Sequence, residues 1–149
     1  MMKIMVILMM PMLFSGQLLA NSDRISLAIS FAKFKQQEGN LHYQVLDCND
    51  SEGSWDTLAV ITTQQLPVSA AVHDVTVEDL PVGKYCVRFF QDLNANGELD
   101  LAANSVPREP VGFSNNPSLM MSQPEPEDCV LQLTQDEAIK VKVNNKRRR

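Results

Sequence analysis

Apolar side chains recur at every second position along most of this chain, and that spacing constrains the fold more than any other feature. In ISLAISF, from Ile25 to Phe31, four large apolar residues alternate with small or polar ones. Because successive side chains of a β-strand point to opposite faces, this spacing predicts a strand with one buried face. No segment after position 20 has an apolar period of 3.6 residues over three turns, so no helix is predicted.

The same spacing predicts further strands, separated by turn residues, over 41–46, 58–62, 71–80, 84–91, 129–133 and 139–143. In KYCVRFFQ, the side chains of Tyr85, Val87 and Phe89 share one face. Each one-faced strand must bury its apolar side against a second sheet, which predicts an all-β chain forming a single antiparallel β-sandwich, Ig-like or transthyretin-like. We expect Ile29, Tyr85, Val87 and Phe89 to lie in its core.

The first twenty residues differ from the rest. A single Lys precedes an apolar run from Ile4 to Phe14 that Pro11 interrupts, and a small residue follows at Ala20. This pattern is typical of a secretory signal peptide, and the run is short of the roughly 20 apolar residues of a spanning helix. We therefore expect a signal peptide over 1–20, a β-sandwich domain over 21–145 and a basic tail over 146–149. The mature chain, without a transmembrane segment, is then periplasmic or extracellular; a retained anchor is the alternative.

The charge balance excludes one class of partner. The chain has 13 basic and 18 acidic residues, for a net charge of −5. Lys3 lies in the first twenty residues and four basic residues lie in the tail, which leaves 8 basic against 18 acidic residues, a net charge of −10. A protein that binds nucleic acids neutralises their phosphates with clustered Lys and Arg. This domain has an acidic excess instead, so we expect no nucleic-acid partner. The tail, Lys146 to Arg149, either contacts an anionic membrane of the cell envelope or stays solvated.

Three cysteines follow the proposed cleavage point, and in an oxidising compartment an odd number predicts one disulfide plus a third thiol. Without a CxxC pair, and with His42 and His73 as the only histidines, a zinc site is not expected. Strand alternation places Cys48 and Cys86 on outer faces, where they can bridge if their strands are neighbours. We expect a Cys48–Cys86 disulfide with Cys129 free or intermolecular. A Cys86–Cys129 bridge, or none, is the alternative.

From 92 to 128 the chain is rich in Asn, Pro and Ser, which predicts one long loop. Its first residues, DLNANGELD, place oxygen-bearing side chains at alternate positions, as in the first half of an EF-hand calcium loop. The candidate ligands of a weak calcium site are Asp92, Asn94, Asn96, Glu98 and Asp100. The EF-hand pattern then fails, because Ala103 stands where an EF-hand has a bidentate Glu, although Glu109 could complete the shell. The alternative is a turn in which these side chains cap backbone amides.

Two segments, GKYCVRFFQDLNANGELD and VPREPVGFSNN, together resemble the signature of a family of small secreted bacterial proteins known as domain of unknown function 2141. Its members have a signal peptide, a β-strand domain, a D-x-N-x-N-G-x-L-D segment and an I-P-x-E-x-x-G-F-S-N-N motif. Here Val106 replaces the usual Ile, and the three cysteines are not part of the pattern. The resemblance covers about Ile25 to Val143. It implies an exported Ig-like or transthyretin-like sandwich, and it implies no activity.

Two classes of function remain. We favour a non-catalytic exported module of the periplasm or cell surface that binds or stabilises an unidentified partner, aided by a weak calcium-binding loop. The alternative is a hydrolytic enzyme that uses acidic residues of the 92–109 loop, such as Asp92, Asp100 and Glu109. No H-E-x-x-H motif, P-loop or dinucleotide fingerprint is present, and two histidines without a recognisable carboxylate partner leave few general bases. We also expect residues 114–116 to stabilise their loop and Trp55 to fill one end of the sandwich.

Overall fold

The computed structural model describes residues 23–50, 53–120 and 122–144. The predicted signal peptide (1–20) and basic tail (146–149) lie outside the described residues. The described part contains no α-helix and is all-β, as predicted. Its elements in chain order are β1 (Arg24–Ala32), β2 (Asn40–Asp47), β3 (Val60–Pro67), β4 (Val72–Pro81), β5 (Gly83–Asp92), β6 (Val111–Phe113), the 3-10 helix η1 (Pro126–Cys129), β7 (Leu131–Leu133) and β8 (Glu137–Lys142).

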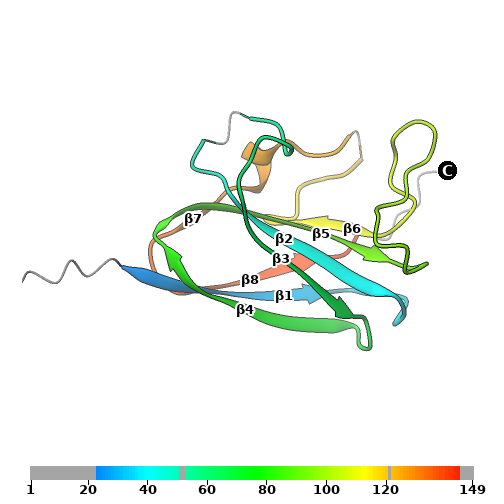
Figure 1. The fold of residues 1–149 in the computed structure, drawn as a ribbon, viewed down its shortest axis with the longest axis horizontal. Coiled ribbons are helices and arrows are strands. Elements are labelled where there is room, and N and C mark those ends of the chain that lie inside the picture. Colours follow the sequence, from blue (N-terminus) through cyan, green and yellow to red (C-terminus); the bar gives the residue numbers. More distant parts are fainter. Residues whose placement is uncertain (1–22, 51–52, 121, 145–149) are drawn as a thin grey trace, which may run out of the picture.

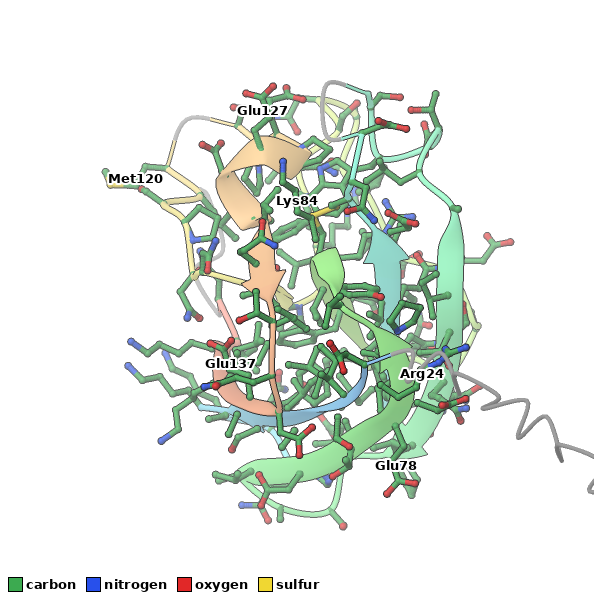
Figure 2. The ribbon with its side chains drawn as sticks, turned by 90° about the vertical axis from the view of Figure 1, so that its left-hand side faces the viewer. Arg24, Glu78, Lys84, Met120, Glu127 and Glu137 are labelled. Carbon is green, nitrogen blue, oxygen red and sulfur yellow. A yellow bond between two sulfur atoms is a disulfide. The ribbon has the colours of Figure 1, made fainter. Side chains whose placement is uncertain are left out.

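The strands form two sheets, shown in Figure 1. The three-stranded sheet has the order β4-β1-β8, and the five-stranded sheet has the order β3-β2-β5-β6, with β7 also paired to β5. Figure 2 shows the sheets as stacked layers, with Glu78 and Glu137 on the three-stranded layer and Glu127 at the opposite end of the view. The chain changes sheet between β1 and β2, between β3 and β4, between β4 and β5, and between β7 and β8.

Alternate side chains of both sheets pack into one apolar core. The four predicted core residues, Ile29, Tyr85, Val87 and Phe89, are between 0% and 4% exposed, so their predicted burial is confirmed. The Phe31 ring of β1 lies 5.1 Å from the Tyr43 ring of β2 and 5.0 Å from the Phe89 ring of β5, measured between centroids. These aromatic contacts join the two sheets, because β1 belongs to one sheet and β2 and β5 belong to the other.

The predicted antiparallel arrangement is wrong for one pair of strands. β1 and β8 run parallel, with Leu27 opposite Glu137 and Ala32 opposite Lys142. The remaining strand pairs are antiparallel. A tight turn forces two strands of the same sheet to be antiparallel. β8 instead follows β7, a strand of the other sheet, so the intervening turn does not set its direction relative to β1.

Every predicted strand differs from the observed strand by at least one residue at an end, and two of these differences have a physical reason. The strand expected over 129–133 is reduced to β7, because Pro124 and Pro126 lack the N–H groups that a ladder requires and the chain forms η1 instead. The strand expected over 58–62 is β3, which begins at Val60 and continues to Pro67. The polar residues in the second half of β3 have no apolar alternation, so only their pairing with β2 reveals the strand.

A second apolar cluster lies on the outer face of the five-stranded sheet, the face turned away from the three-stranded sheet. It contains the Cys48–Cys86 disulfide, whose Cα atoms are 5.9 Å apart, so the predicted pairing is confirmed. Both cysteines lie on this outer face, as strand alternation predicted, and both are fully buried beneath the segments that cover it. Trp55 belongs to this cluster, Leu58, Leu119 and Val130 pack against it, and η1 lies over the face in Figure 1. Trp55 packs here rather than at a sheet end, and its Nε1 donates to the Pro124 carbonyl at 2.8 Å.

Cys129 is the third cysteine, and it is free and fully buried in this outer cluster. Burial, with a smaller contribution from Asp128, raises the pKa of the Cys129 thiol to about 12. Only the thiolate is nucleophilic, so roughly one thiol in ten thousand is reactive at pH 8. We expect iodoacetamide to leave the native protein unmodified at pH 8 and to modify Cys129 alone after denaturation without reductant. Mass spectrometry measures both states, and three labelled thiols would contradict the disulfide.

Candidate cation-binding loop

The loop begins where β5 ends. Asp92, the last residue of β5, has a carboxylate that is 1% exposed. Its Oδ1 accepts a hydrogen bond from the backbone N–H of Asn96 at 3.2 Å, and its Oδ2 accepts one from Gly97 at 2.8 Å. Gly97 has a φ of +82°, a left-handed conformation that favours glycine. The Asp92 side chain therefore holds the loop in a tight turn around itself.

Two asparagines and a second aspartate complete the turn. The Asn94 Oδ1 accepts from the Asn96 N–H at 3.0 Å, and the Asn96 Oδ1 accepts from the Glu98 N–H at 2.8 Å. Both asparagine Nδ2 groups donate to the Asp100 carboxylate, at 2.6 Å from Asn94 and 3.2 Å from Asn96. The structure thus brings together four of the five predicted ligand residues.

Glu98, the fifth predicted ligand, contributes differently. Its backbone N–H is part of the turn, but its side chain is exposed, and no hydrogen bond or ion pair among the described residues joins its carboxylate to the other four residues. In an EF-hand loop, the seventh position likewise contributes its backbone carbonyl rather than its side chain. Glu98 is therefore not placed as a side-chain ligand.

Glu109 connects the two ends of the predicted ligand segment. Its Oε1 accepts from the Leu93 N–H at 2.7 Å, and its Oε2 accepts from the Asp100 N–H at 3.1 Å. Glu109 is buried, with only 7% of the residue exposed. The backbone N–H of Arg108 also donates to the Asp100 carbonyl at 2.8 Å, which holds the returning chain beside the segment. From the sequence, Glu109 is a residue that could complete a ligand shell; in the structure both of its carboxylate oxygens accept backbone N–H groups of the loop.

Sequence reasoning missed His42 as a neighbour of the loop. Its Nε2 lies 3.4 Å from the Asp92 Oδ2, and this nitrogen is buried without a hydrogen-bond partner. The His42 ring stacks on the Phe90 ring, with centroids 4.8 Å apart. The antiparallel register of β2 and β5 pairs His42 with Phe90 and so brings it near Asp92. No local signal could have revealed this neighbour, because it comes from the adjacent strand.

Gly39 allows the β1–β2 connection to lie against the start of the loop. Its φ is +72°, and a Cβ placed on it would lie 2.0 Å from the Asp92 carbonyl oxygen. Any side chain at this position would therefore push the connection away from Asp92. The absence of a side chain at Gly39 thus helps to position the first residue of the candidate site.

The donor set determines which ion this loop could hold. Counting only His, Cys, Asp and Glu, no group of three or more in the described residues is arranged to hold a metal ion. A cation here would depend on the asparagine oxygens as well as on the Asp92 and Asp100 carboxylates. Such all-oxygen sets suit calcium rather than zinc. The hydrogen bonds seen in the structure are those of the alternative prediction, a turn in which side-chain oxygens cap backbone N–H groups.

Residues 114–116 stabilise their loop, as the sequence favoured. The Ser114 Oγ donates to the Cys129 carbonyl and accepts from the Val87 N–H at 3.0 Å. The Asn115 Nδ2 donates to the Val130 carbonyl at 2.8 Å. Asn116 contacts the edge of β8, where its Nδ2 donates to the Lys140 carbonyl and its Oδ1 accepts from the Lys142 N–H. The polar groups of this segment therefore serve the chain's own backbone.

The fold and this loop together define the class of protein: a two-sheet β protein with an Asp/Asn loop held by a buried glutamate. The chain belongs to the family described as "Uncharacterized protein conserved in bacteria (DUF2141)", whose model matches residues 29–142. The resemblance found in the sequence is thereby confirmed. Neither the curated proteins nor the solved structures include a significant match. No helix among the described residues is long and apolar enough to cross a membrane.

Proposed function

We propose that the protein is a non-catalytic, exported Ig-like or transthyretin-like β-sandwich of the periplasm or cell surface, whose 92–109 loop binds calcium weakly as a structural ion. The observation that carries this proposal is the convergence of Asp92, Asn94, Asn96 and Asp100 within one loop. Each of their oxygens accepts one hydrogen bond, and an sp² oxygen has a second lone pair that can coordinate a cation.

Charge supports calcium as the ion. Asp92 and Asp100 bring two negative charges to the loop, which a divalent cation would neutralise. Without its predicted signal peptide and tail the chain has a net charge of −10, which raises the local concentration of cations. A loop with only two ligating carboxylates suits the affinity of extracellular calcium modules, with dissociation constants of about 10⁻⁴ to 10⁻³ M.

The hydrogen bonding of the acidic residues supports a non-catalytic role. A general base or nucleophile must reach a substrate atom with an available oxygen. Asp92 and Glu109 are buried and accept backbone N–H groups, and Asp100 accepts from two asparagine amides. These are the three residues that the hydrolytic alternative requires. Burial keeps the Asp92 and Glu109 oxygens from a substrate in solution, which favours a structural use of their charge.

Calcium titration of the mature protein tests the ion. At about 10 mM calcium and a dissociation constant near 1 mM, binding adds about 1.4 kcal/mol to the free energy of unfolding, or about 5 °C in melting temperature. Asp100→Asn should abolish most of this shift, because it removes one of the two charges while keeping an acceptor oxygen. Glu98→Gln is the matched control, since it removes a charge from the same loop at a side chain outside the cluster. Equal melting temperatures in calcium and in EGTA would contradict calcium binding by this loop.

The proposed export is tested by a different experiment from calcium binding. The buried Cys48–Cys86 disulfide supports an oxidising compartment, because such bonds rarely persist in a reducing cytoplasm. We expect N-terminal sequencing of protein recovered from the periplasm or medium to begin at or near Asn21. Recovery of a chain that begins at Met1 would contradict cleavage after Ala20.

A further inference from the structure

We infer that the outer edge of β3 is a self-association edge, along which a second copy of this chain pairs its own β3 in antiparallel fashion to extend the five-stranded sheet. β3 is the end strand of that sheet, and only β2 pairs with it. In Figure 2 it forms the right-hand margin of the molecule. Its other side carries a row of backbone N–H and carbonyl groups that form no hydrogen bond with the described residues.

The register identifies which backbone groups face outward. The Val68 N–H donates to the Gly39 carbonyl, and the Asp47 N–H donates to the Ala59 carbonyl, at the two ends of the β2–β3 pair. Bonding to the neighbour alternates along an antiparallel pair. The backbone groups of Gln64 therefore face β2, while those of Thr63 and Gln65 face away from the sheet. These outward groups are available to another strand.

The composition of β3 distinguishes it from the other long edges. No Asp, Glu, Lys or Arg occurs from Thr57 to Val72, and Val60 and Ile61 are 48% and 46% exposed. Natural edge strands usually avoid pairing through charges, bulges, proline or cover. Here a register shift near Val60 and a proline at position 67 limit the edge at its ends. The central segment, Thr62–Leu66, has none of these protections.

The edges of the three-stranded sheet are protected. β4 carries Asp74, Glu78 and Asp79, so two copies of it would repel each other. β8 carries two lysines, and Asn116 occupies backbone groups on its edge. β6 and β7 are only three residues long. β3 is thus the one long uncharged edge among the described strands of an acidic chain.

A second copy is the occupant that this edge fits best. In a strongly acidic protein, two copies can approach only along a surface without like charges, and β3 supplies such a surface. A two-fold axis at Gln64 places Thr63 opposite Gln65 of the other copy and Gln65 opposite its Thr63. Each of these two pairs then forms two backbone hydrogen bonds, because Thr63 and Gln65 both direct their N–H and carbonyl groups outward. Gln64 lies opposite itself across the axis.

Charge substitution at Gln64 tests both the edge and the register. Sedimentation equilibrium of the mature protein, with covalent dimers excluded on a non-reducing gel, should show a concentration-dependent dimer with or without calcium. Gln64→Glu and Gln64→Lys each place like charges opposite one another, and each should weaken dimerisation about fivefold or more. An equimolar mixture of the two variants should restore the dimer as a heterodimer. Gln132→Glu on β7 is the matched control and should dimerise like the unchanged protein.

Three results would overturn the inference. A chain that stays monomeric up to millimolar concentration has no self-association edge. A dimer that both Gln64 variants leave unchanged uses another surface. Variants that both weaken the dimer but do not recover on mixing exclude the two-fold register at Gln64. Far-ultraviolet circular dichroism and melting curves of each variant confirm that the exposed substitution leaves the fold intact.

Discussion

Replacing Phe89 by alanine should lower the free energy of unfolding by about 3–5 kcal/mol, because it removes a large buried ring and leaves a cavity. The Phe89 ring is 4% exposed and lies 5.0 Å from the Phe31 ring and 6.1 Å from the Phe34 ring. Gly112 of β6 leaves room for it, since a Cβ there would lie 2.2 Å from a Phe89 ring carbon. Urea denaturation followed by Trp55 fluorescence measures the loss.

Phe90→Ala is the matched control for that experiment. Phe90 is the next residue of β5, points to the outer face and is only half-buried, with its ring stacked on His42. The loss of stability should be smaller than for Phe89, because less apolar surface is buried there. A loss below 1 kcal/mol for Phe89→Ala, with the larger loss at Phe90, would mean that the strand faces are assigned the wrong way round.

Removing the Cys48–Cys86 disulfide by a double alanine substitution should cost about 4 kcal/mol. The bond closes a loop of 38 residues, and chain-entropy estimates for a loop of that length give about this value. Alanine is preferred to serine, because both sulfurs are fully buried and a serine hydroxyl would lack a partner. Denaturation curves of the oxidised protein and of the variant give the difference.

Cys129→Ala is the control for the disulfide experiment. It truncates a third buried cysteine of the same cluster without removing a cross-link, so its cost should be about 1 kcal/mol. Equal losses for the single and double substitutions would show that the cross-link adds nothing to stability. Peptide mapping without reduction should recover Cys48 and Cys86 in one linked peptide.

The elements that could be predicted are those whose periodicity reflects a single buried face. Tyr85, Val87 and Phe89 alternate with residues of the opposite face, and this local signal is sufficient to place β5 and its core side chains. After Thr62, β3 gives no such signal, because most of its residues are exposed on both faces. The direction of β8 relative to β1 depends on a partner at the other end of the chain, which no local pattern encodes.

The candidate site divides in the same way. The alternate oxygens from Asp92 to Asp100 are close in sequence, so their convergence could be predicted from spacing. His42 and Gly39 reach the site only through strand register and chain packing. The sequence also did not reveal that the outer face of the five-stranded sheet is covered. Trp55 and η1 pack near Cys86, but Trp55 precedes Cys86 in the sequence and η1 follows it.

The pairing of β1 with β8 has a consequence for the order in which this protein acquires its structure. The Ser26 N–H donates to the Asp136 Oδ1 at 2.7 Å across 110 positions of the chain. Contacts between such distant segments form slowly, because a long loop must lose its conformational entropy before they form. An incomplete chain leaves one edge of β1 unpaired until Lys142 has emerged. This topology therefore ties completion of the three-stranded sheet to the last strand of the chain.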